Sequence, residues 1–210
     1  MMRKWNSLFV ALLCAVPVAA QDMKSVFVNM PDSIVPLLTK VNREDCVDFL
    51  ASDMKAVVKN RFDCSAELKT LTADYLQMQL TEVSTLELKL LPLKDSVQVI
   101  CMVRTVCASA CDSEVRFFGT DWKELPASDY FALPSEEVFY LPKDSVGGEY
   151  DELRTKADLY LVKASLSPDD ASLTLKYDTP SYINKEDREK LAACLRKASV
   201  VLEWREEGFR

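Results

Sequence analysis

The side chains that could carry chemistry in this chain are acidic, aromatic and sulfur-containing, because histidine is absent. Without histidine there is no Ser-His-Asp or Cys-His nucleophile system and no histidine-containing zinc site. Four glycines, Gly119, Gly147, Gly148 and Gly208, are too few and too scattered for a P-loop or a G-x-G-x-x-G turn. The composition therefore predicts no catalytic residue, no metal site and no cofactor.

Two motifs suggest enzymatic alternatives. Ser52-Asp53-Met54-Lys55 matches the S-x-x-K motif of penicillin-recognising enzymes, in which a lysine one helical turn away helps to activate the serine. A Lys-Thr-Gly motif does not follow, so we interpret the match as chance on a surface helix. Adjacent carboxylates, such as Glu136-Glu137 and Asp151-Glu152, keep a carboxylate-dependent envelope enzyme such as a glycosidase as the alternative function.

An unusual concentration of aromatic residues lies between positions 117 and 140. If they point outward, they form a platform for a peptide or a sugar ring; if they point inward, they form a second core, which is the preferred interpretation. The platform hypothesis expects Trp122→Ala and Tyr140→Ala to abolish partner binding with little change in melting temperature. Its candidate binding residues are Phe118, Trp122, Tyr130, Phe131, Phe139 and Tyr140.

The N-terminus has the pattern of a secretory signal. Arg3 and Lys4 precede a short apolar stretch, and Val18-Ala19-Ala20 supplies small residues for cleavage before Gln21. The apolar stretch is too short to span a bilayer, so we expect cleavage and no membrane insertion afterwards. The sequence predicts a periplasmic or secreted location.

Six cysteines remain after residue 20, an even number that is typical of exported chains with disulfides. Sequence cannot choose among 15 pairings, although Cys107–Cys111 is the easiest by proximity. The alternatives are buried free thiols and, with lower weight, a metal site at Cys101, Cys107 and Cys111. The six are Cys46, Cys64, Cys101, Cys107, Cys111 and Cys194.

The first half of the mature chain changes period from helical to alternating near Thr70. We expect a short helix over 33–41, then a longer helix from Asn42 to about residue 61. Four strands follow, joined by short polar turns, with one apolar face covered by both helices. The residues expected on that face are Leu76, Met78, Leu80, Leu86, Leu88, Leu90, Val97, Val99, Cys101, Val103, Val115 and Phe117.

Proline and glycine divide the chain into segments. The predicted division is a signal peptide at 1–20, a helix-helix-four-strand subdomain at 21–125, a crossing segment at 126–149 and a smaller α+β subdomain at 150–210. In the last segment we expect a helix near 150–157, a hairpin over 159–177, a helix capped by Asn184 and a strand over 200–204. Asn42-Arg43-Glu44-Asp45 and Asn184-Lys185-Glu186-Asp187 are alike, which suggests two similar subdomains.

The order of segments resembles a family of exported Bacteroidetes-type proteins of unknown function over the whole mature chain. The resemblance implies export and a non-catalysing α+β build, and it transfers no functional residue. The order is also similar to each half of the proteinaceous β-lactamase inhibitors, which is a fold-level analogy. The matching runs are Met30-Pro31-Asp32-Ser33-Ile34, Asn42-Arg43-Glu44-Asp45, Ile100-Cys101 to Thr105-Val106-Cys107, Thr120-Asp121-Trp122-Lys123 and Lys185-Glu186-Asp187-Arg188-Glu189-Lys190.

The charge completes the prediction. With 26 basic and 33 acidic residues the net charge is −7, and an acidic chain without a basic block is a poor partner for nucleic acid. We therefore expect an α+β protein with antiparallel sheet and helices on one face. Its expected role is that of a non-enzymatic binding module of the cell envelope, with an unknown protein or glycan as partner. A β-lactamase-inhibitor-like docking protein is a further alternative.

Overall fold

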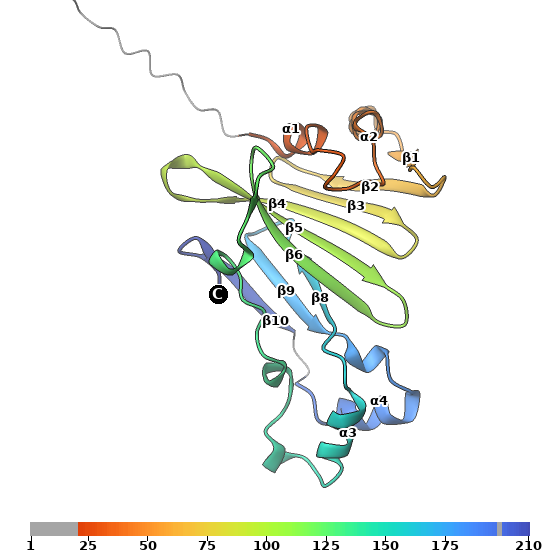
Figure 1. The fold of residues 1–210 in the computed structure, drawn as a ribbon, viewed down its shortest axis with the longest axis vertical. Helices are drawn as coiled ribbons and strands as arrows, with labels where there is room; N and C mark the ends of the chain where they lie inside the picture. Colours follow the sequence, from red (N-terminus) through yellow and green to blue (C-terminus); the bar gives the residue numbers. More distant parts are fainter. Residues whose placement is uncertain (1–20, 197–198) are drawn as a thin grey trace, which may run out of the picture.

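The computed structural model describes residues 21–196 and 199–210, so the predicted signal peptide lies outside the described residues. Two antiparallel sheets lie face to face, and two helices cover the outer face of the larger sheet (Figure 1). The α+β class with antiparallel sheets is confirmed. Within the described ranges no helix is long and apolar enough to cross a membrane.

The large sheet has seven strands in sequence order, preceded by α1 and α2. Each strand is antiparallel to its neighbours, as short connections require. The elements are α1 (Met23–Val28), α2 (Lys40–Ala51), β1 (Val57–Lys59), β2 (Ser65–Leu71), β3 (Tyr75–Thr81), β4 (Ser84–Pro92), β5 (Gln98–Cys107), β6 (Cys111–Gly119) and β7 (Glu124–Leu125).

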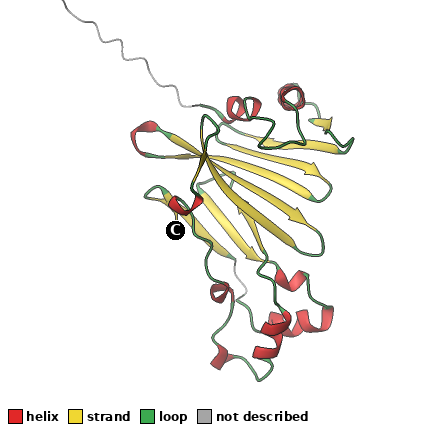
Figure 2. Cartoon of the chain, viewed as in Figure 1, coloured by secondary structure: helices red, strands yellow, loops and turns green. Residues whose placement is uncertain are grey.

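The small sheet has the spatial order β11-β10-β9-β8 and packs on β4, β5 and β6. Two helices gather at one end of it, beyond the edge of the large sheet (Figure 2). The elements are α3 (Tyr150–Lys156), β8 (Val162–Leu166), β9 (Ser172–Tyr177), α4 (Lys185–Ala192), β10 (Val200–Arg205) and β11 (Gly208–Phe209). The helices, hairpin and final strand predicted for this half are present, and Asn184 caps α4 through a bond from the Asp187 N–H at 3.0 Å.

The first predicted helix is wrong. Residues 33–39 form turns, and the first helix is α1, which the sequence analysis missed. The second helix ends at Ala51, and residues 57–59 form β1 because the β-branched pair Val57-Val58 favours a strand. Thr39 rather than Asn42 is its N-cap, with Asn42 at the third helical position. Asn42 and Asn184 therefore occupy different positions in their helices, and their similarity gives no support to duplication.

The assignment of one apolar face was correct for β3 and β4 and wrong for β5 and β6. Ile100, Met102 and Phe118 face the helices, whereas Val99, Cys101, Val103 and Phe117 face the small sheet. The unbroken apolar run from Val99 to Val103 is the pattern of a strand buried on both sides, and it was interpreted as one-sided alternation. An exposed concave sheet face, which docking in the manner of a β-lactamase inhibitor needs, is therefore covered on β4 to β6.

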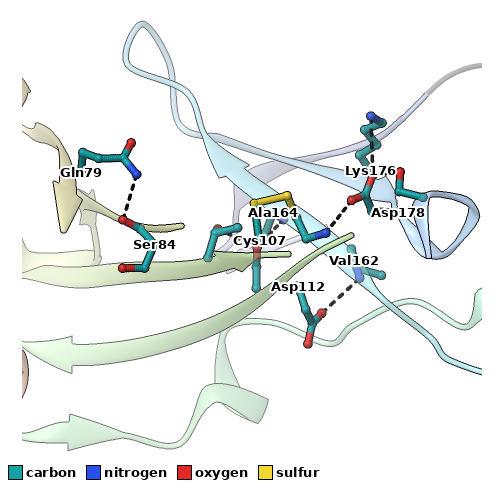
Figure 3. Close-up of a disulfide and its surroundings, with 12 residues drawn as sticks. Gln79, Ser84, Cys107, Asp112, Val162, Ala164, Lys176 and Asp178 are labelled. Atoms are coloured by element: carbon teal, nitrogen blue, oxygen red, sulfur yellow. Dashed lines mark hydrogen bonds and ion pairs between the residues drawn. A yellow bond between two sulfur atoms is a disulfide. The ribbon is translucent and has the colours of Figure 1, made fainter. Parts of the chain in front are cut away.

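β8 is an edge strand of the small sheet, and the backbone N–H groups on its outer edge donate to side chains of the large sheet. The Val162 N–H donates to Asp112 Oδ1 at 3.2 Å (Figure 3). The N–H groups of Ala164 and Leu166 donate to Ser113 Oγ and Glu87 Oε2 at 2.9 and 2.8 Å. An unpaired strand edge is a hazard for aggregation, and a buried unpaired N–H costs free energy. These bonds therefore hold the two sheets in register.

The predicted Cys107–Cys111 disulfide is present at the tip of the β5–β6 hairpin, where the two residues are direct cross-strand partners (Figure 3). The Cys111 N–H donates to Asp178 Oδ2 at 2.6 Å, which links this tip to the end of β9. Among the described cysteines, Cys46, Cys101 and Cys194 are buried free thiols and Cys64 is an exposed one. Burial raises the pKa of Cys46 to about 11, so this thiol stays protonated and packs as a small apolar group.

A polar layer lies between the sheets. Glu87, which is 8% exposed, accepts from Tyr75 Oη, Gln77 Nε2 and the Leu166 N–H. Lys89, also buried, pairs with Asp74 at 2.9 Å. Burial raises the pKa of Glu87 above its ordinary value of 4.5, against the lowering effect of its hydrogen bonds.

Glu87 predicts a pH dependence of stability. Because the folded state binds the Glu87 proton more tightly than the unfolded chain, its stabilising contribution is complete below pH 4.5 and is lost as the pH rises through the raised pKa. We expect wild type to lose free energy of unfolding relative to Glu87→Gln between pH 4 and pH 7. Urea denaturation of both proteins across this range measures the difference, and a constant difference would contradict the prediction.

Candidate functional site

The structure places the predicted aromatic platform residues in the protein core. Phe118, Trp122, Phe139 and Tyr140 are between 0 and 7% exposed, and Tyr130 and Phe131 are half-buried. Phe118 and Trp122, with ring centroids 5.4 Å apart, pack under the helices. The other four pack in or against the core between the sheets, so the large sheet separates the two groups and they form no common surface. The preferred core interpretation is the one that the structure supports.

An open cleft of about 620 Å³ lies among the described residues. It lies at the helical end of the molecule, between the segment 137–143, α3 and Arg196. Tyr140 is the one platform candidate that lines it. The complete lining is Glu137, Tyr140, Leu141, Pro142, Lys143, Tyr150, Asp151, Arg154, Thr155 and Arg196.

Two backbone hydrogen bonds join residues 139–141 to residues 194–196, which are far apart in the sequence and both contribute to the cleft. The Leu141 N–H donates to the Cys194 carbonyl and the Arg196 N–H donates to the Phe139 carbonyl, both at 2.8 Å. This short antiparallel bridge fixes the C-terminal segment beside residues 139–141. Helix α3 forms the opposite wall, with Asp151, Arg154 and Thr155 on the side that faces the cleft.

Arg154 is the centre of the cleft's interactions. Its guanidinium carbon lies 3.9 Å from the centroid of the Tyr140 ring, which is a close cation–π contact. Its nitrogens donate to Glu137 at 2.8 and 3.1 Å and to Glu136 at 3.2 Å. These bonds raise the pKa of Arg154 and lower that of Glu137. Arg154 is therefore fixed before any ligand arrives.

Tyrosines continue this network into the core. Tyr177 Oη donates to Glu136 Oε1 at 2.5 Å and lies 3.1 Å from Tyr140 Oη. Burial, followed by the bond to Glu136, raises the pKa of Tyr177, so its hydroxyl stays protonated at ordinary pH. The floor of the cleft is consequently rigid, since each of these polar groups already has a partner.

Arg196 differs from the other cations of the cleft. Lys143 pairs with Asp151 at 2.6 Å, and Arg154 pairs with Glu136 and Glu137. The Arg196 side chain donates from Nε to the Tyr140 carbonyl at 3.1 Å, and no carboxylate pairs with it among the described residues. The lining thus holds three cations and two carboxylates in a chain whose net charge is −7.

A smaller hollow of about 300 Å³ adjoins the cleft and shares Tyr150 with it. Leu153 and Cys194, both buried, form its apolar wall, and Lys190 pairs with Glu149 at its rim at 3.6 Å. Burial raises the pKa of Cys194, so its thiol is not activated. The full lining is Val146, Gly147, Gly148, Glu149, Tyr150, Leu153, Lys190, Ala193 and Cys194.

The motifs that suggested enzymes are not arranged for catalysis. Ser52 is the residue after the last turn of α2, so Lys55 lies beyond the helix and pairs with Glu67 at 3.6 Å. Glu136 and Glu137 both hold Arg154. In the second carboxylate pair, Asp151 binds Lys143 and Glu152 binds Lys156. Each of these four carboxylates therefore already pairs with a cation.

Among the cleft residues, the sequence pointed to Tyr140 as a binding candidate and to Glu137 and Asp151 as carboxylates. The cations Lys143 and Arg154, which pair with these carboxylates, and Arg196 were missed. Arg154 follows Tyr150 by four residues on a helix, a spacing at which side chains meet, so this pair was accessible from the sequence. Arg196 could not be found in this way, because it is more than fifty residues from Tyr140 in the sequence and meets it only through the fold of the chain.

A family model described as a protein of unknown function, DUF3256, matches residues 15–209. The chain belongs to the DUF3256 family. No curated protein matches it. A solved domain of an uncharacterized protein from Porphyromonas gingivalis W83 has a TM-score of 0.80 at 24% identity, with 91% of this chain and 98% of that chain covered.

The solved domain supports the fold of this DUF3256 protein and carries no activity to it, because the identity is low. Membership in a family of unknown function agrees with the predicted resemblance, and the solved relative comes from an organism of the predicted kind.

Proposed function

We propose that this DUF3256 protein is an exported, non-enzymatic binding protein of the cell envelope and that the cleft beside α3 is its binding site. Export is supported by the basic, apolar and small-residue pattern of residues 1–20, followed by Gln21. The Cys107–Cys111 disulfide agrees with an oxidising compartment.

One observation carries the binding role, the arrangement of Arg154 in the cleft. It stacks on Tyr140 and is held by Glu136 and Glu137, so the wall of the cleft needs no rearrangement when a ligand binds. A concave site whose polar groups are fixed in advance loses little conformational entropy on binding. The pairing of the neighbouring carboxylates favours binding over acid–base chemistry.

The binding role is tested by amide NMR shifts of the chain from Gln21 onward, titrated with defined small molecules. The probes are N-acetylglucosamine, glucuronate, a tetrapeptide with a free carboxyl end and octanoate. We expect saturable shifts at Asp151, Thr155 and Arg196, with Lys24 on α1 as a distant reference. If no probe shifts these amides, or if shifts are spread evenly over the surface, the proposed site is wrong.

Export is tested separately by expressing the full chain in a Bacteroidetes host. Intact mass measurement of the protein recovered outside the cytoplasm should give a chain that begins at Gln21. Recovery of the uncleaved chain from the cytoplasm would contradict export without affecting the binding test.

A further inference from the structure

We propose that the cleft and the smaller apolar hollow form one site for the carboxyl end of a peptide whose last residue has an apolar side chain. This inference rests on the proposed binding function and specifies its ligand. Tyr150, the first residue of α3, lines both hollows, so the two adjoin at this ring. A ligand that passes over Tyr150 therefore contacts a charged site and an apolar site at once.

Arg196 is the group that receives the carboxylate. The bond from its Nε to the Tyr140 carbonyl orients the side chain, and this leaves its two terminal nitrogens for a ligand. A guanidinium presents parallel N–H donors that match the two oxygens of a carboxylate. Lys143 and Arg154 add positive potential nearby, although carboxylates of the protein already pair with them.

The apolar hollow receives the last side chain. Leu153, Cys194 and the ring of Tyr150 are buried and form its inner wall, and Lys190 and Glu149 lie paired with each other at its rim. At Gly147 and Gly148 the space where a Cβ would lie is open, so the entrance is not blocked. An aliphatic side chain placed against this wall gains free energy for the apolar area that it removes from water, which favours an apolar last residue.

The proximity of a carboxylate site to an apolar hollow favours a peptide end. In a peptide, the terminal carboxylate and the last side chain are attached to the same carbon atom. A fatty acid also has a carboxylate and an apolar part, but its carboxylate lies at the end of a linear alkyl chain. The experiment must therefore distinguish a fatty acid from a peptide.

The experiment uses the chain from Gln21 onward and measures dissociation constants by the same amide shifts. The main probe is acetyl-Ala-Ala-Ala-Leu with a free carboxylate. Comparison probes are its C-terminal amide, the peptide ending in glycine, and octanoate. We expect the amide and the glycine peptide each to bind at least fivefold more weakly than the main probe, and octanoate to bind more weakly as well.

Two variants test the two halves of the site. Arg196→Ala should weaken the main probe at least fivefold and should leave the binding of its amide almost unchanged. Ala193→Phe should fill the apolar hollow and weaken the leucine peptide more than the glycine peptide. The matched controls are Arg205→Ala, an exposed arginine on β10, and Ala192→Phe, an exposed alanine outside the lining. Both controls should bind as wild type does.

Equal binding of the peptide and its amide would overturn the proposal, as would equal losses in Arg196→Ala and Arg205→Ala. Tighter binding of octanoate would also overturn it and assign the site to a fatty acid. If only N-acetylglucosamine or glucuronate shifts the cleft, the ligand class is wrong while the binding function stands. If no probe shifts the cleft, both are wrong. Circular dichroism melting of each variant separates loss of binding from loss of folding.

Discussion

Trp122→Ala is expected to lower the free energy of unfolding by about 3–5 kcal/mol, the range for truncating a large core aromatic residue. Trp122 is 7% exposed and packs against Phe118. Its indole Nε1 donates to the Val26 carbonyl of α1 at 3.1 Å. This residue therefore attaches the first helix to the large sheet, and its loss leaves both a cavity and an unpaired carbonyl.

Urea denaturation followed by far-ultraviolet circular dichroism measures the effect. Trp122→Phe keeps most of the ring and loses the hydrogen bond, so it should lose less, about 1–2 kcal/mol. Phe62→Ala is the matched control, because Phe62 is 75% exposed and its truncation should change stability by no more than about 0.5 kcal/mol. If Trp122→Ala is as stable as wild type and a binding partner is lost, the exposed platform hypothesis is correct after all.

The backbone at Trp122 explains why the sequence did not reveal this role. Its φ angle is 63°, in the left-handed region, and its N–H donates to the Gly119 carbonyl in a turn after β6. The turn folds the side chain back under α1. Side-chain alternation along a strand cannot be extended through such a turn, so a prediction based on period 2 has no information on which face Trp122 lies.

Periodicity was sufficient where one face of an element is polar. It located β3, β4, α3, the β8–β9 hairpin and α4, whose patterns are clean. It failed at β5, where both faces are apolar, because the small sheet that covers the second face comes from residues 162–209. A pattern within one strand does not state how many layers cover it, and only the arrangement of distant segments decides this.

The cleft illustrates the same limit for function. The four-residue spacing on α3 is enough to anticipate the contact of Arg154 with Tyr150, at 3.3 Å, whereas Glu136, Glu137 and Tyr140 reach Arg154 from the crossing segment. Neither charge nor motif spacing predicts such a meeting. The exclusion of histidine chemistry needed only the composition, because a missing residue type excludes its chemistry regardless of the fold.

Arg43 supports the second prediction with a large effect. Its side chain is 1% exposed, and it lies on α2 beneath the turns of residues 30–38. Its terminal nitrogens donate to the Leu38 carbonyl at 2.9 Å, to the Met30 carbonyl and to Asp32 at 3.1 Å. A helix was expected over 33–41, and the structure instead has turns there, with the carbonyls of Met30 and Leu38 held by Arg43.

Arg43→Met is expected to lower the free energy of unfolding by about 4 kcal/mol. Methionine fills a similar volume but leaves two buried carbonyls unpaired, at about 1–3 kcal/mol each. Asp32 is not the main source of the loss, because it is 42% exposed and keeps its pair with Arg61 at 2.8 Å. Arg43→Lys should recover less than half of the loss, since one ammonium cannot reach the same acceptors in the same geometry.

Arg61→Met is the matched control for Arg43→Met. It removes the other cation from Asp32, and Arg61 is 48% exposed, so the loss should be no more than about 1 kcal/mol. Urea denaturation of the three variants at one pH gives the comparison. Equal losses in Arg43→Met and Arg61→Met would locate the energy in the Asp32 ion pair and would contradict the role of the carbonyls. A large loss confined to Arg43 would mean that one buried arginine holds the non-helical N-terminal turns on the layer of helices.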